Sequence, residues 1–273
     1  MGMEMNSTPA YARLVVIVPK FSHWHGTRVM KSSDYLVFDA SKLPPSQTVK
    51  DLGRQYQIDP KNLREFVTLR KHAFNTLAAA GIRFMGGYAI PQSQAASVME
   101  TLDSLKRRYE KATERFIAHY DRYIDEWADS NPEIAGSIRS GKLSQSDVAQ
   151  RFASGYSAVK LAPLSGREDE LERSVRELKN DVIAEAVNAA KKAHKDFVEG
   201  NNDSSRYLKT RLVRAVDKLG SLSFLHEDVE RLYASASDAV RQIPDGALEG
   251  DAFNCAARAA EMIVSEGTRV AER

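Results

Sequence analysis

Two histidines that flank a tryptophan, His23-Trp24-His25, are the residues with the clearest potential for chemistry. In an extended segment, residues two apart point to the same face, so both imidazoles could share a Zn²⁺ ion. No cysteine or further histidine lies nearby in the sequence, and His72 and His119 could join the pair only through folding. We therefore favour surface or hydrogen-bonding histidines over a metal site, and we expect no metal and no cofactor.

The sequence lacks the common catalytic motifs. It has no Gly-x4-Gly-Lys-Ser/Thr phosphate loop, no Gly-x-Ser-x-Gly and no His-Glu-x-x-His. Cys255 is the single cysteine; it lies in an alanine-rich segment that is typical of helix packing rather than of a nucleophile. Acidic residues such as Glu227 and Asp228 are expected to offset a helix dipole. The sequence therefore predicts a protein that is not an enzyme.

Two basic helical segments are candidates for contact with nucleic acid. Lysines and arginines at helical spacing can follow a phosphate backbone. The candidates are Arg107, Lys111 and Arg115 on the first segment, and Arg211, Arg214 and Lys218 on the second. Acidic residues such as Glu110 and Glu114 interleave with the first stripe, so an ordinary solvated helix face is the favoured alternative.

Aromatic and arginine side chains in the N-terminal third form a third candidate set. Trp, Tyr and Arg dominate the energetics of protein interfaces, so these side chains could bind a protein partner if loops expose them. The candidates are Trp24, Arg28, Arg83, Phe84 and Tyr88. The alternative for Trp24 and Phe84 is a place in the hydrophobic core.

Charge is spread unevenly along the chain. Residues 1–91 contain 12 Lys and Arg against 6 Asp and Glu, a net charge of +6, whereas the whole chain carries only +2 and the remainder therefore −4. A basic head on an acidic body suits either an anionic partner or contact between the two parts. The alternative is scattered, solvated charge.

Short β elements are predicted in the N-terminal third. Leu14–Val18 is aliphatic and β-branched, which is typical of a buried strand, and 35–38 is a second candidate. Asp59 followed by Pro60 predicts the start of a helix that ends near Gly81. Residues 82–90 then form a predicted hairpin folded at Gly86-Gly87.

The rest of the sequence predicts helices. Apolar residues at steps of three and four predict a long amphipathic helix over about 94–127. Ser165 and Glu168 resemble a capping box before a second long helix that ends near Phe197. Short helices are expected after Asn131-Pro132 and after Ser144, followed by three helices over about 205–219, 225–242 and 248–270, with Gly220 as one break between them.

The predicted fold is mainly α with a small N-terminal β element (α+β), an elongated helical bundle with two long amphipathic helices. The expected domains are a flexible tail over 1–10, a basic α+β head over 11–91 and a helical bundle body over 92–273. No apolar run approaches the roughly 20 residues that span a bilayer, and residues 1–10 do not resemble a signal peptide. We therefore expect a cytoplasmic protein without a membrane span, which a single cysteine also suits.

The head resembles the bacterial and phage domain-of-unknown-function family 3150. The residues that carry the resemblance are the aliphatic strand, Trp24-His25-Gly26, Leu52-Gly53, Asp59-Pro60, the block Gly81-Ile-Arg-Phe-Met-Gly-Gly-Tyr-Ala-Ile-Pro91, and Tyr120, Tyr123 and Trp127. The resemblance covers about residues 12–130, and it implies no catalytic residue. It also implies a setting on phages or mobile elements, near MoxR-type AAA+ ATPases and proteins with von Willebrand A domains.

The leading functional hypothesis is a non-catalytic helical scaffold or adaptor, or a client, of such an ATPase system. The long helices would allow self-association into a homo-oligomer, by coiled-coil-like contacts. The second hypothesis is a nucleic-acid-binding accessory protein of a phage or mobile element. A third is a helical, membrane-acting protein that rearranges like a pore former.

Overall fold

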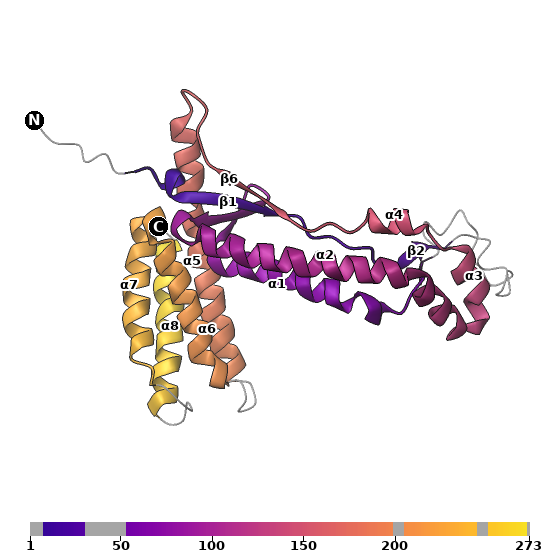
Figure 1. The fold of residues 1–273 in the computed structure, drawn as a ribbon. Helices are drawn as coiled ribbons and strands as arrows, with labels where there is room; N and C mark the ends of the chain where they lie inside the picture. Colours follow the sequence, from indigo (N-terminus) through magenta and orange to yellow (C-terminus); the bar gives the residue numbers. More distant parts are fainter. Residues whose placement is uncertain (1–7, 31–52, 199–204, 245–250, 272–273) are drawn as a thin grey trace, which may run out of the picture. The chain divides into compact units, whose positions relative to one another are not determined.

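A computed structural model describes residues 8–30, 53–198, 205–244 and 251–271 (Figure 1). They form two compact units. The first unit is drawn from residues 1–18, 76–99 and 158–273, and the second from residues 19–75 and 100–157. This division differs from the predicted head and body, which meet at residue 91. Each unit combines segments from both sides of that residue, because β and helical elements far apart in sequence pack together.

A four-stranded sheet has the strand order β4-β5-β1-β6. Its strands are β1 (Leu14–Pro19), β4 (Ile82–Phe84), β5 (Gly87–Pro91) and β6 (Tyr156–Lys160). β1 pairs antiparallel with β5, so that Leu14 lies opposite Pro91 and Ile17 opposite Tyr88. The predicted strand at Leu14–Val18 is confirmed, whereas the candidate at 35–38 lies outside the described residues.

The β4–β5 hairpin is confirmed, but its turn lies one residue earlier than predicted. Phe84 pairs with Gly87, which leaves Met85 and Gly86 as the two turn residues. Their φ values are +47° and +77°, the positive pair of a type I′ turn. Gly87 is instead a strand residue at a close approach: a Cβ there would lie 2.6 Å from the carbonyl oxygen of Ile17.

Helix α1 (Arg64–Ala80) starts as predicted. Asp59 accepts a hydrogen bond from the backbone N–H of Lys61 at 2.9 Å, and Pro60 opens the short 3₁₀ helix η4 (Pro60–Leu63) that leads into α1. The predicted long helix is confirmed as α2 (Gln92–Asp129), whose 38 residues give a length of about 57 Å. η5 (Pro132–Ile134), α3 (Ala135–Ser140) and α4 (Gln145–Ala149) follow, and Ser144 caps α4 as expected.

The C-terminal helices are α5 (Glu168–Val198), α6 (Ser205–Ser221), α7 (Glu227–Arg241) and α8 (Asp251–Ala271). One predicted cap is wrong: α5 begins at Glu168, whose carboxylate accepts from the N–H of Gly166, so Ser165 lies too far upstream to be its cap. The break predicted at Gly220 lies slightly later, since α6 ends at Ser221. Gly220 is in the last turn of α6, where a Cβ would come 2.6 Å from the Tyr233 ring, so it permits close helix packing.

The first unit has one continuous hydrophobic core. The four helices α5–α8 lie side by side in the salmon, orange and yellow part of Figure 1. Their inward-facing residues form a single cluster with residues of the sheet. Members from the bundle include Val182, Leu212, Leu232 and Ile263, and members from the sheet include Leu14, Val16, Ile82 and Ala89. The sheet therefore packs one face against the bundle, and the predicted mainly α fold with a small β part is confirmed.

The second unit has an aromatic core. Phe66 of α1 lies at its centre, with ring centroids 4.7 Å from Phe152 and 5.2 Å from Tyr109. Its ring stands at 89° to that of Phe116, an edge-to-face geometry that aromatic pairs prefer. A two-stranded sheet of β2 (Thr27–Val29) and β3 (Arg54–Tyr56) also belongs to this unit.

Candidate binding site

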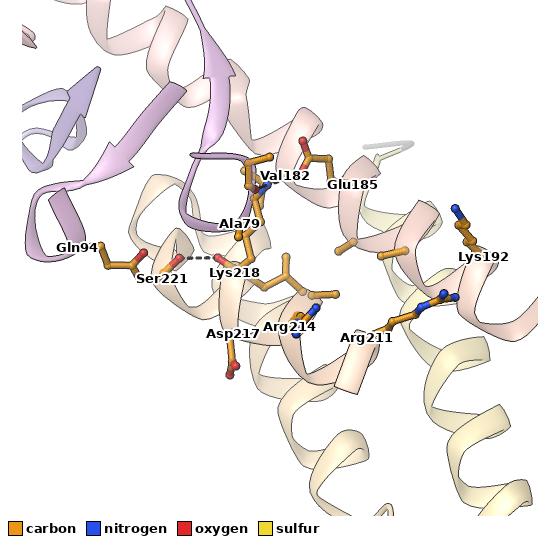
Figure 2. A pocket seen from close by; sticks show the side chains of 15 residues that line it. Ala79, Gln94, Val182, Glu185, Lys192, Arg211, Arg214, Asp217, Lys218 and Ser221 are labelled. Carbon is orange, nitrogen blue, oxygen red and sulfur yellow. Dashed lines mark hydrogen bonds and ion pairs between the residues drawn. The ribbon is translucent and has the colours of Figure 1, made fainter. Parts of the chain in front are cut away.

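A pocket of about 610 Å³ opens between α5 and α6 in the first unit (Figure 2). Its other lining residues come from the last turn of α1 and the first turn of α2. Along α5 it extends from Val182 to Lys192, which corresponds to about 15 Å of helix. Figure 2 shows Lys192 and Arg211 towards one end of the pocket and Gln94 and Ser221 towards the other.

Small apolar side chains form the floor of the pocket. Helix periodicity places Val182, Ala186 and Ala189 on one stripe of α5, facing Ala215 and Leu219 of α6. Val182, Ala186 and Leu219 also belong to the hydrophobic core of the bundle. The lining along this seam is therefore made mostly of small apolar side chains.

Cationic side chains surround this floor. The charged lining residues are Lys192, Arg211, Arg214 and Lys218, against the carboxylates Glu185 and Asp217, so the pocket has a net charge of +2. Lys192, Arg211 and Arg214 are exposed. The electrostatic field at the pocket therefore favours an anionic group.

Lys218 has a different role from the other three. Its Nζ donates to the carbonyl oxygen of Ala78 at 2.8 Å and forms an ion pair with Glu185 of α5. Only 12% of the Lys218 side chain is exposed. Lys218 therefore forms part of the wall of the pocket and holds its elements together.

Three of the six nucleic-acid candidates thus converge at one place. Arg211, Arg214 and Lys218 line the pocket, whereas Arg107, Lys111 and Arg115 lie on α2 in the second unit. The α2 residues are exposed, as the helical stripe predicts. Arg115, however, donates two hydrogen bonds of 2.9 Å to the carboxylate of Glu65, which neutralises one end of that stripe.

Two of the predicted partner-contact residues are buried. Trp24 is 3% exposed, with its ring edge-on to Tyr120 at 5.6 Å, and Tyr88 is 4% exposed in β5. Both are core residues, because loops and a hairpin that were expected to expose them pack over them instead. Arg83 is exposed, but its guanidinium lies 4.6 Å from the centre of the Tyr88 ring. Phe84 packs against the core of the first unit.

Arg28 belongs to a partly buried polar network of the second unit. Its Nη2 donates to the carbonyl and hydroxyl oxygens of Ser137 at 3.1 and 2.7 Å, and the Ser137 hydroxyl donates to Gln55 at 3.0 Å. With the Gln57 amide turned so that it donates to the Ile138 carbonyl, its oxygen accepts from Arg28 Nε at 3.0 Å. The members of the predicted contact set are divided between the two units: Trp24 and Arg28 belong to the second, and Arg83, Phe84 and Tyr88 to the first.

The histidine pair does not acquire further ligands. The rings of His23 and His25 lie 5.1 Å apart, as their spacing predicts. Burial and the nearby His25 and Arg70 lower the pKa of His23, which disfavours its charged form. Among the described residues no group of three His, Cys, Asp or Glu side chains is placed to hold a metal ion.

Cys255 is half-buried on α8, consistent with the predicted place between helices. Within the described part of the chain, no helix is long and apolar enough to cross a membrane.

Sequence reasoning missed the α5 half of the pocket. Lys192 and Ala189 were not candidates, because neither stands out in a helix rich in both residue types. The available signal was the clustering of alanines on one stripe of α5, which permits close approach of a ligand or a neighbouring helix. Only the packing of α5 against α6 brings Lys192 near Arg211 and Arg214.

A family model described as "Protein of unknown function (DUF3150)" matches residues 12–265, nearly the whole chain. The chain belongs to this family, and the resemblance first seen over residues 12–130 extends through the C-terminal bundle. No curated protein and no solved structure matches the chain.

Proposed function

We propose that this member of the DUF3150 family is a non-catalytic helical adaptor. Its partners would be a MoxR-type AAA+ ATPase and a von Willebrand A protein, in an assembly encoded by a phage or mobile element. The family resemblance suggests these partners. The observation that carries the adaptor role is the pocket between α5 and α6, with its apolar floor and exposed cationic side chains. Such a combination is typical of sites that anchor a partner.

The α5–α8 bundle supports a binding role physically. Its core is continuous and its helices contact one another over several turns, so the pocket lies on a rigid support. A rigid site binds without a large ordering cost. Exposed faces of the long helices would also permit self-association of the chain.

Co-purification tests this proposal. The chain, tagged at its own locus, is expected to retain the ATPase and the von Willebrand A protein encoded beside it through two purification steps. A tagged, unrelated helical bundle expressed at the same level serves as the control. A chain that elutes alone, with both neighbours recovered in the unbound fraction, argues against the adaptor role.

Nucleic-acid binding is the second candidate. It is favoured by the exposed stripe of Arg107 and Lys111 on α2. Binding through these groups would weaken steeply with salt, because each phosphate contact releases counterions. Duplex and single-stranded DNA titrated at low salt would reveal it, and a flat titration at about 50 mM salt would remove this candidate.

A further inference from the structure

We propose that the pocket between α5 and α6 binds an acidic, amphipathic segment of a protein partner. The inference rests on the proposed adaptor function and adds the chemistry of what is bound. It commits to one ligand class: a helical or extended peptide with an apolar anchor and neighbouring carboxylates.

The floor of the pocket selects an apolar anchor. Ala78, Ala186, Ala189 and Ala215 present methyl groups around a space of about 610 Å³. Burial of one Leu- or Phe-sized side chain on such a surface is favourable, because it removes apolar area from water. The floor offers few polar groups, so a ligand without an apolar part would leave it solvated and gain little from it.

The rim selects carboxylates. Lys192 of α5 and Arg214 of α6 are both exposed, and neither has an ion pair with any other described residue. Arg211 adds a third exposed positive charge at the same end of the pocket (Figure 2). Charge complementarity of this kind sets the orientation of a bound segment and raises its association rate.

The length of the pocket suits a segment rather than a single side chain. About 15 Å of α5 lines it, which equals roughly three turns of a bound helix. Amphipathic helices bind such grooves through anchors three or four residues apart. One peptide helix along the pocket would therefore present an apolar anchor and a carboxylate from neighbouring turns.

Two carboxylates disfavour nucleic acid at this site. Glu185 and Asp217 also line the pocket, and a continuous phosphate backbone would have to pass close to them. Lys218, the most buried of the four cations, is already engaged by Glu185 and the Ala78 carbonyl. A peptide can place its few carboxylates beside Lys192 and Arg214 alone, whereas a polyanion cannot.

The experiment selects ligands for the full chain from a display library of random peptides of about 16 residues, roughly 24 Å when helical. Enriched peptides are expected to carry Leu, Ile or Phe three or four positions from Asp or Glu. The affinity of one enriched peptide is then measured by fluorescence anisotropy for the wild type and five variants. Enrichment of neutral or basic peptides would overturn the proposal.

The variants separate the rim from the floor. The double variant Lys192→Glu, Arg214→Glu is expected to bind the peptide at least about tenfold more weakly, and each of its single changes to have a smaller effect. Ala189→Leu fills the floor and is expected to weaken binding as well. Lys191→Glu makes the same charge change as Lys192→Glu, but on a neighbouring exposed residue of α5 that does not line the pocket, and is expected to bind like the wild type.

Thermal melting shows whether each variant is folded. Equal binding by the wild type and a folded double variant, or by the wild type and folded Ala189→Leu, contradicts the proposal.

Two further measurements separate this inference from the adaptor function. Duplex DNA that binds the wild type, displaces the peptide and fails to bind the double variant would assign the pocket to nucleic acid instead. Peptide binding without capture of the ATPase or the von Willebrand A protein would support the proposed ligand of the pocket and contradict the adaptor role. Capture of both proteins by the double variant at wild-type affinity would show that the pocket does not bind these partners, and would support the adaptor role.

Discussion

Lys218 Nζ donates a hydrogen bond of 2.8 Å to the carbonyl oxygen of Ala78, in the last turn of α1. Carbonyl groups in a final helical turn have no partner within their own helix, and a cation there also offsets the helix dipole. The same ammonium group pairs with Glu185 of α5. A lysine predicted to contact nucleic acid therefore joins the end of α1, α5 and α6, and so shapes the pocket that its neighbours Arg211 and Arg214 surround.

Replacement of Lys218 by methionine should destabilise the first unit. The change removes a hydrogen bond from a charged donor and leaves the Ala78 carbonyl without that partner, at a cost of about 1–3 kcal/mol in the free energy of unfolding. Urea denaturation of the full chain measures the cost. Lys191→Met, at an exposed position of α5, should stay within about 0.5 kcal/mol of the wild type. Equal stabilities for the two variants would contradict the structural role of Lys218.

Two glycine-to-alanine substitutions should have opposite effects. At Gly267 of α8, a Cβ would lie 2.3 Å from a methyl group of Val187, a short side chain with little room to move. Overpacking costs about 1–3 kcal/mol, which exceeds the roughly 1 kcal/mol that alanine contributes to helix stability. At Gly136 of α3, a Cβ would have no atom within 4 Å, so Gly136→Ala should be neutral or stabilising. Thermal denaturation distinguishes them; a stabilised Gly267→Ala variant would contradict the close packing of α5 and α8.

Asp228 should make stability depend on pH in the acidic range. Burial raises the pKa of this carboxyl, but the hydrogen bond from Lys179 at 3.1 Å and the charges of Lys179 and Arg231 outweigh it, so the net pKa lies below its ordinary value. A depressed carboxyl pKa contributes stability that is fully present above the unfolded-state value and is lost as pH falls through the folded-state value. Asp228→Asn should therefore cost about 1–3 kcal/mol near neutral pH.

The difference between Asp228→Asn and the wild type should shrink below about pH 4, where the wild-type carboxyl also becomes neutral. Urea denaturation of both proteins across this range provides the measurement. A difference that stays constant down to the acid unfolding of the wild type would show that the charge of Asp228 is not what stabilises the α5–α7 contact.

His226 should stabilise α7 as a helix cap. Its Nδ1 accepts a hydrogen bond from the backbone N–H of Asp228 at 3.1 Å, which requires an unprotonated Nδ1. His226→Ala should cost about 1 kcal/mol, whereas His226→Asn, which supplies another favoured capping side chain, should retain most of the stability. Chemical denaturation near neutral pH compares the two. If Asn proves as harmful as Ala, the positive charge of His226 beside Asp228 is the relevant interaction.

Local signals in the sequence predicted the helices and the hairpin well. Asp59 and Ser144 were predictable as caps because the side-chain oxygen and the backbone N–H that it accepts from lie within three residues of each other in the sequence. The stripe along α2 is similarly local, since every third or fourth residue must face the same core. The β4–β5 turn shifted by one residue because Gly87 is required by contact with β1, which no local pattern reveals.

Long-range packing explains what the sequence did not predict. β6 (Tyr156–Lys160) was missed because its side chains are mostly exposed, so it shows no apolar alternation. Trp24 was a candidate for exposure until Tyr120, nearly a hundred residues later, covered it. The same holds for the pocket. Arg211 and Arg214 were recognisable as basic residues, but Lys192 lines the same pocket only because α5 packs against α6.

The most direct test of the proposed adaptor role is light scattering during size-exclusion chromatography. The purified chain would be mixed with the two proposed partners, a purified MoxR-type ATPase and a purified von Willebrand A protein from the same genome, in the presence of a non-hydrolysable ATP analogue. The account predicts a single peak whose mass includes this chain and at least one of the two proteins. Three separate peaks, each with the mass that the protein shows alone, would contradict it.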